Sequence, residues 1–218
     1  MSPSPTEPAL TSWRFDRQAC LTDLVAFEQL LADKAELGDR DDVLPLFRAH
    51  PHLTAALGSY HPNIAIPDRL GLEVPLFGQF QADAISGDGS TGAFCLVEFE
   101  EGRPNSVFVR RGRQTSTWAA RLEHGFSQIV DWFWLLDDQR QTTAFETFFG
   151  ARQIDVFALL VLGRDRDLSM AERQRLAWRR SRVVVNSQHV FCCTFDQLAV
   201  DLRVRLSGSG PAARAGVP

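Results

Sequence analysis

The stretch from Phe77 to Glu100 constrains the fold more than any other part of the sequence, because it combines two apolar runs with a glycine-rich turn. Side chains alternate between the two faces of a strand, so Glu98 and Glu100 share one face of the second run. The turn formers at residues 87–92 predict a β-hairpin that brings Asp83, in the first run, close to Glu98. The pattern therefore predicts a sheet with a group of carboxylates at one edge.

This carboxylate group is the clearest chemical signal in the sequence. Desolvated like charges cost on the order of several kcal/mol, so acidic side chains seldom gather on a partly buried strand without a cation to neutralise them. Asp83 and Glu98 are accordingly candidate metal ligands. The alternative interpretation, which applies to Glu100 as well, is a set of solvated acids on an edge strand.

Size and composition predict one domain with a single core, because the chain has 218 residues and 44% of them are hydrophobic. Residues 1–11 and 207–218 are rich in proline and small residues and are expected to be disordered tails, which leaves a single domain over residues 12–206. The formal net charge is -4. A nucleic-acid surface would therefore have to be a local basic patch.

The cysteines and the N-terminal sequence indicate the cellular compartment of the protein. The four cysteines contain no C-x-x-C pair and are expected to be buried thiols of a reducing compartment, with Cys192 and Cys193 on opposite faces of a strand. The N-terminus lacks the layout of a signal peptide, and the longest apolar run, Val156–Leu162, is too short to span a bilayer. We expect a soluble, cytoplasmic protein that does not bind a membrane.

Apolar periodicity and capping residues predict helices that alternate with strands. The expected helices cover Trp13–Leu37 (N-cap Ser12, stop at Gly38), Val43–Ala49, Leu53–Leu57, Thr115–Asp137, Ser169–Arg182 and Asp196–Leu206. The expected strands cover Leu70–Phe77, the two arms of the acidic hairpin, Ser106–Arg110, Asp155–Leu162, Val183–Val185 and Val190–Phe195, the first of them forming a meander. This order predicts the α/β class, with a mixed sheet flanked by helices.

Three histidines, His50, His52 and His61, lie close together in the sequence. A metal site is one interpretation, but two of the three precede proline at helix boundaries and the run supplies no regular ligand spacing. The structural interpretation is therefore favoured.

The order of elements, together with Asp83, the Glu98-x-Glu100 pair and Gln128 on the next long helix, resembles the restriction-endonuclease-like fold of the PD-(D/E)XK nucleases. More narrowly, it resembles the nuclease domain of the Shedu anti-phage defence proteins, with an αβββαβ core. The resemblance covers roughly residues 43–202, and the matching segments are VLPLFRAHPHL, QADAI, LVEFE, HGFSQIVDWFW, FALLVLGR and VFCCTFDQLAV.

The resemblance implies a metal-dependent DNA endonuclease that hydrolyses phosphodiester bonds of phage or plasmid DNA, and a tendency to form homo-oligomers. Asp83, Glu98 and the Phe99 carbonyl would hold Mg²⁺ or Mn²⁺, and Gln128 would be the helix glutamine near the site. Carboxylate and carbonyl oxygens are the hard ligands that magnesium prefers, and such an ion stabilises the pentavalent phosphate and activates the attacking water.

One position departs from the family pattern. The third active-site residue is usually lysine, and Glu100 occupies that place here, while Lys34 on the first helix is the only lysine in the chain. An arginine could stabilise charge but is a poor proton acceptor. Glu100 would then orient the water or hold a second metal ion. The alternative is a domain that has lost cleavage and keeps only nucleic-acid binding.

Clustered arginines could meet the DNA backbone, since phosphate contacts need little beyond positive charge. One cluster is Arg110, Arg111 and Arg113, and another is the seven arginines from Arg164 to Arg182. The alternative for the second cluster is a solvated helix face, because acidic residues are interspersed. The aromatic run at residues 132–134 is expected to be core or an oligomer contact.

Overall fold

A seven-stranded mixed sheet is the centre of the computed structural model, which describes residues 10–110, 112 and 115–208. Strands β4, β7 and β9 run parallel to one another, and the other neighbours pair antiparallel. The predicted α/β class and mixed sheet are confirmed. The strands lie in the order β1 (Thr11–Ser12), β2 (Arg69–Leu76), β3 (Phe80–Asp88), β4 (Ala93–Phe99), β7 (Asp155–Val161), β9 (Gln188–Cys193) and β8 (Val184–Val185).

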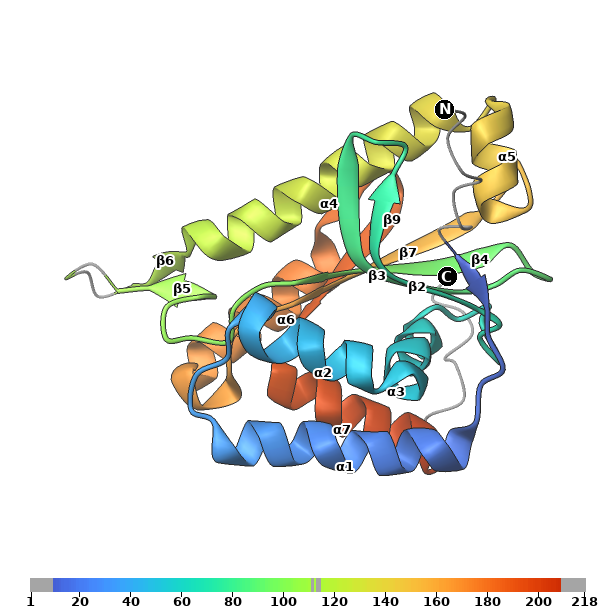
Figure 1. Ribbon diagram of the computed structural model, residues 1–218. Coiled ribbons are helices and arrows are strands. Elements are labelled where there is room, and N and C mark those ends of the chain that lie inside the picture. The colour runs from blue at the N-terminus through green and yellow to red at the C-terminus, as the bar shows by residue number, and fades with distance from the viewer. Residues whose placement is uncertain (1–9, 111, 113–114, 209–218) are drawn as a thin grey trace, which may run out of the picture.

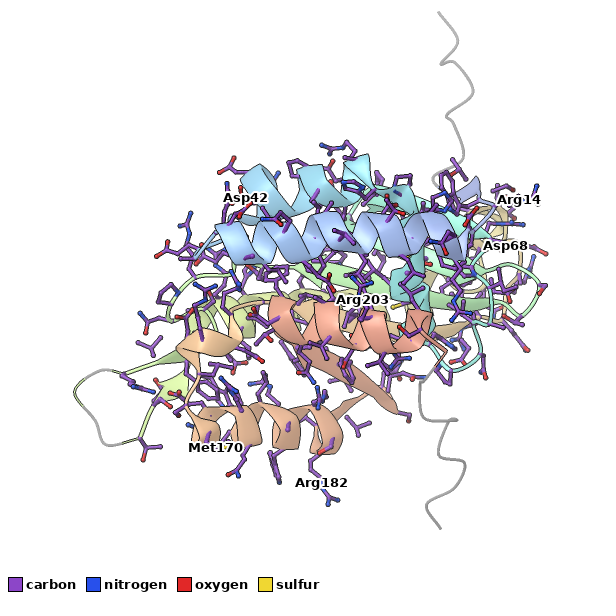
Figure 2. All side chains as sticks on the ribbon, turned by 90° about the horizontal axis from the view of Figure 1, so that it is seen from below. Arg14, Asp42, Asp68, Met170, Arg182 and Arg203 are labelled. Carbon is purple, nitrogen blue, oxygen red and sulfur yellow. The ribbon has the colours of Figure 1, made fainter. Side chains whose placement is uncertain are left out.

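Helices cover both faces of this sheet (Figure 1). One face is covered by α1 (Arg17–Asp33), the π-helical turn η1 (Asp39–Val43), α2 (Leu44–Ala49), α3 (Pro51–Ala56), the 3-10 turn η2 (Leu57–Tyr60) and α7 (Phe195–Leu206). The other face is covered by α4 (Ala120–Gln139), α5 (Thr143–Phe149) and α6 (Met170–Arg182), with the short turn η3 (Asp165–Asp167) before α6. Figure 2 shows the first face from below, where Arg203 of α7 donates to Glu28 of α1 at 2.9 Å.

Alternation along the central strands divides the core into two layers, one on each face of the sheet. All seven residues of β4 are buried; Val97 and Phe99 pack in the α1 layer, and Leu96 packs in the α4 layer. Cys193 and Cys192 likewise fall in different layers, so their predicted opposite orientation is confirmed. Because a strand buried on both faces needs apolar residues at successive positions, the continuous apolar runs predicted these central strands correctly.

The region before α4 differs from the prediction. A helix was expected from Thr115, but Thr117–Trp118 forms strand β6, which pairs with β5 (Phe108–Val109), and α4 begins only at Ala120 and ends at Gln139. Strand β5 therefore belongs to a separate two-stranded sheet. The meander consists of β2, β3 and β4, and the expected strand over Ser106–Arg110 is not part of it.

The first helix is shorter than predicted because Asp16 caps its N-terminus and Lys34 leaves the helical conformation at its C-terminus. Asp16, not Ser12, is the N-cap, and its carboxylate accepts the backbone N–H groups of Gln18 and Ala19. Ser12 instead lies in β1, opposite Arg69. Lys34 ends the helix in an extended conformation. The helix α5 was not expected; Thr142 caps its N-terminus.

Other predicted elements agree closely with the structure. Strands β2 and β7 and helices α2 and α7 are within two residues of their predicted bounds. Helix α6 has the predicted capping box, in which Ser169 and Glu172 bond to each other's backbone N–H groups. Most of each expected tail, residues 1–9 and 209–218, lies outside the described residues. Among the helices of the described residues, none has the length and apolarity needed to cross a membrane.

A buried arginine joins three separate elements of the fold. Arg164, only 1% exposed, follows β7 and donates from Nε to Asp196 of α7 at 2.9 Å. It also donates to the carbonyl oxygens of Leu31 at 2.7 Å and Lys34 at 2.6 Å, at the end of α1. The guanidinium is thus fully engaged inside the protein.

We expect Arg164→Ala to lower the free energy of unfolding by about 3 kcal/mol or more, because it leaves Asp196 and two helix-terminal carbonyls without their donor. Urea denaturation followed by circular dichroism measures this. Arg182→Ala, at the exposed end of α6 (Figure 2), is the matched control and should change stability by less than about 0.5 kcal/mol. Equal effects of the two substitutions would contradict a structural role for Arg164.

Candidate active site

The hairpin of β3 and β4 places Asp83 beside Glu98. The antiparallel ladder ends at the pair Ala84 and Val97, so Asp83 and Glu98 are the residues directly next to its last pair. The two acids are near enough that the charge of Asp83 raises the pKa of Glu98. In addition, the Phe99 backbone N–H donates to Asp83 Oδ2 at 2.8 Å. The structure thus brings together the two acidic residues that the sequence singled out as candidate metal ligands.

A local distortion of the β2–β3 pair puts Asp83 at a bend. Glu73 lies opposite Asp83 in the register but has a φ of 49°, a left-handed value that strains a side chain with a Cβ, and the ladder skips this position. Ala82 and Ala84 consequently pack in different core layers although they are two residues apart. Figure 1 shows the far end of the β2–β3 hairpin turned up alongside α4.

Glu98 is a buried acid with an unpaired oxygen. Its side chain is on the α4 face of β4, the residue is 6% exposed, and Oε2 has no hydrogen-bond partner among the described residues. Burial, followed by the neighbouring charges of Asp83 and Glu100, raises the pKa of Glu98 to about 10. Burial also raises the pKa of Asp83 to about 6, against the opposing hydrogen bond from Phe99. Without a cation, the two carboxyl groups cannot both be ionised at neutral pH at low energetic cost.

Glu100 lies just beyond β4 and is 2% exposed. Its backbone N–H donates to Val161 of β7 at 2.9 Å, which continues the strand geometry and keeps the side chain on the same face as Glu98. The carboxylate is occupied by two basic groups of α4: His124 Nδ1 lies 2.8 Å from Oε1, and Arg121 donates to Oε2 at 3.3 Å. Burial raises the pKa of Glu100, and these two partners oppose that shift.

Helix α4 can approach Glu100 closely because it has glycine at position 125. A Cβ on Gly125 would lie 2.7 Å from Leu160 Cδ1 and 3.1 Å from Glu100 Cγ, so a larger residue would push the helix away from the sheet. Gln128, one turn further, donates to the carbonyl oxygen of Gln81 at 3.3 Å. Gln128 therefore contacts β3 two residues before Asp83, through a hydrogen bond to the backbone and not to a carboxylate.

The site contains functional candidates that sequence reasoning missed. Arg121 and His124 precede Gln128 at helical spacing, so all three lie along one side of α4, and this spacing is the signal that could have revealed them. Asp39, at the start of η1, is close enough to raise the pKa values of Asp83 and Glu98, while Arg40 lowers them. No periodicity in the sequence predicts this last contact, because η1 is far from the hairpin along the chain.

The arginines predicted to contact nucleic acid differ in how free their side chains are. Arg110 is exposed, but its guanidinium bonds to Glu172 of α6 at 2.9 Å. Arg111 and Arg113 lie outside the described residues. Within the second arginine cluster, Arg164 is buried and therefore cannot reach DNA. Arg179 lies over the Trp118 ring at 5.0 Å and binds α6 to the β5–β6 pair, so this cluster is in part structural.

The three histidines considered above are separate in the structure. His50 Nδ1 lies 3.0 Å from Asp23, and His52 Nδ1 accepts the backbone N–H of Asp16. His61 is buried. In residues 10–110, 112 and 115–208, no group of three or more His, Cys, Asp or Glu side chains is arranged to hold a metal ion.

The donors that remain for a metal ion are two carboxylates and a backbone carbonyl. Asp83 uses Oδ2 for the Phe99 N–H, and Glu98 Oε2 is unpaired. Because the N–H and C=O of a strand residue point to the same side, the Phe99 carbonyl faces the Asp83 side of β4. Magnesium usually binds one or two carboxylates and keeps several waters, so this small set of hard oxygen donors fits the ion.

Fold and site together define an α/β protein with a buried carboxylate pair at the bend of its mixed sheet. The family model for the Shedu protein SduA, C-terminal, matches residues 39–199, most of the chain, and the chain therefore belongs to this family. Membership suggests a role in anti-phage defence. No curated protein matches the chain.

The proton on Glu98 makes stability depend on pH. Since the pKa rises from 4.5 to about 10 on folding, the folded protein holds the proton more tightly, and stability should fall as pH rises between these values, by about 1.4 kcal/mol per pH unit at most. Glu98→Gln, which removes the ionisable group, should be more stable than wild type at about pH 8 in EDTA, and the difference should shrink toward pH 5. Urea unfolding measures it.

Glu146→Gln, on exposed surface of α5, is the matched control and should show a nearly constant difference from wild type across this pH range. A wild-type stability that rises with pH relative to Glu98→Gln would contradict a raised pKa at Glu98.

Proposed function

We propose that this protein is a metal-dependent DNA endonuclease of the PD-(D/E)XK type that acts in anti-phage defence. The observation that carries the proposal is the buried Oε2 of Glu98, which has no hydrogen-bond partner among the described residues and lies near the carboxylate of Asp83. A folded protein keeps such an arrangement at an energetic cost, and charge pairs of this kind cluster at functional sites. The family match supports the defence role.

Asp83, Glu98 and the Phe99 carbonyl would hold Mg²⁺ or Mn²⁺. When bound, the ion would stabilise the charge of the pentavalent phosphate and lower the pKa of the attacking water. The chain's own contribution is to hold the two carboxylates together: the register sets their separation, and the Phe99 N–H fixes the orientation of Asp83. Gln128, which donates to the Gln81 carbonyl, links α4 to β3 two residues before Asp83.

Exposed arginines near the carboxylates could bind the DNA backbone. Arg40 precedes the carboxylate pair on η1, Arg103 follows Glu100 on the loop after β4, and Arg121 lies on α4; all three are exposed. Arg40 lowers the pKa of Asp83, Arg121 pairs with Glu100, and Arg103 pairs with Glu101, the residue next to Glu100. Phosphate binding at such positions needs only clustered positive charge, and it weakens as salt concentration rises.

We also propose a cytoplasmic location. The four cysteines are buried and free, which suits a reducing compartment. Phage DNA enters that same compartment of an infected cell, so a nuclease of this type would meet its substrate there.

A second candidate function is nucleic-acid binding without cleavage. Glu100 favours it, because an acid stands where the family pattern has lysine, and its carboxylate is already bound to Arg121 and His124. The same two bonds argue against Glu100 as a ligand of a second metal ion, since its oxygens are occupied.

The nuclease proposal predicts that wild-type protein with Mg²⁺ or Mn²⁺ cleaves plasmid or linear DNA, and that Asp83→Ala reduces the rate by at least about 100-fold, because one of two carboxylate ligands is lost. Agarose gels of timed reactions measure this. Asp138→Asn, which removes an exposed acid at the far end of α4, is the matched control and should cleave like wild type.

Binding measurements separate the two candidate functions. Retention of DNA in gel shifts without cleavage under any metal would favour the binding module. Calorimetry should show Mn²⁺ uptake by wild type that Asp83→Ala weakens. Wild-type protein that takes up no Mn²⁺ and leaves DNA intact would overturn the nuclease proposal.

A further inference from the structure

Glu100, at the position where the family pattern has lysine, contacts two basic side chains of helix α4. Glu100 is buried, and both of its oxygens bind groups on α4: Oε1 the Nδ1 of His124, and Oε2 the guanidinium of Arg121. His124 itself is 65% exposed, and Arg121 is 45% exposed. An acid in the strand thus holds a histidine in a fixed position at the surface of the site.

We propose that His124, oriented by Glu100, is the proton acceptor that replaces lysine in DNA hydrolysis. This inference rests on the proposed nuclease function and assigns one of its catalytic residues. Glu100 is a positioning residue in this arrangement, and the positive charge of Arg121 lowers the pKa of its carboxyl group.

The hydrogen bond defines the chemical state of the imidazole. Glu100 Oε1 lies 2.8 Å from His124 Nδ1, and in the proposed arrangement Nδ1–H donates to this oxygen. The lone pair of neutral His124 then lies on Nε2, at the exposed side of the ring. A carboxylate that holds histidine in one tautomer is the same device by which the buried aspartate of serine proteases orients its histidine.

The other basic side chains are less suited to this step. Lys34, the only lysine, ends α1 and is paired with Asp42. Arginines remain protonated at any physiological pH and cannot accept a proton. Gln128 has no basic group. Of the two side chains that hydrogen-bond to Glu100 in the described part of the chain, His124 is the one with an imidazole, the group that most often serves as a general base.

The position of α4 allows the step. Gly125 brings the helix against Glu100, and Gln128 reaches the Gln81 carbonyl two residues before Asp83. His124 lies directly before Gly125, at the point where α4 is closest to Glu100. In the reaction, Nε2 takes a proton from water as the water oxygen bonds to phosphorus. The bond from phosphorus to the leaving deoxyribose oxygen breaks, and that oxygen takes its proton from solvent water.

His124→Ala should slow single-turnover cleavage of linearised plasmid DNA with Mn²⁺ by about 100-fold or more, the usual contribution of a general base, while DNA affinity in gel shifts stays within about threefold of wild type. Added imidazole should restore at least part of the lost rate, because the exposed side chain leaves an open space. His52→Ala, on α3, is the matched control and should cleave like wild type with or without imidazole.

A double-mutant cycle tests the role of Glu100. Glu100→Gln alone should slow cleavage by about tenfold, but Glu100→Gln combined with His124→Ala should be no slower than His124→Ala, because Glu100 acts through His124. A purely structural role would make the two losses add.

The outcomes distinguish this inference from the nuclease proposal. If wild type cleaves DNA and His124→Ala cleaves at a similar rate, or if imidazole restores nothing, the inference is overturned while the nuclease proposal stands. If wild type does not cleave, both are overturned.

Discussion

The burial of two carboxyl groups at the bend of one hairpin is the constraint on which the rest of the structure depends. Glu98 is buried on the α4 face of β4, and Asp83 is set opposite it by the strand register. Neither side chain contacts a basic group directly, and Glu98 keeps one oxygen unpaired among the described residues. The surrounding apolar core must therefore hold these acids in place by packing, since burial disfavours their charged forms.

Two features of the surrounding fold meet that requirement. The central strands β4 and β7 are buried on both faces, so the hairpin is anchored by core residues in two layers. Helix α4 adds a second support, because Gly125 lets it lie against Glu100 and Leu160. The acid that replaces the expected lysine is thus neutralised from the helix. The positive charge that a strand lysine would have supplied comes instead from Arg121 of α4, which donates to Glu100 beside the imidazole of His124.

Local sequence patterns predicted the parts of the fold that depend on neighbouring residues. Alternation identified the hairpin and the shared face of Glu98 and Glu100, and the capping box identified the start of α6. Prediction was poorer where a distant partner decides the structure. The apolar stripe of the next helix was extended back to Thr115, but Thr117–Trp118 pairs with Phe108–Val109 and forms a strand. The start of α1 was misplaced because Asp16 is its N-cap, while Ser12 pairs with Arg69 in β1.

The sequence by itself determined the alternation of strands and helices, the acidic hairpin and the absence of lysine from the expected position, because these depend on residue type and short spacing. Only the tertiary structure decided that α4 packs with Arg121 and His124 on Glu100, that Asp39 approaches the same acids, and that Arg164 is buried. The physical reason is that these contacts join segments far apart in the chain, and their geometry follows from how the helices pack on the sheet, which short-range periodicity does not specify.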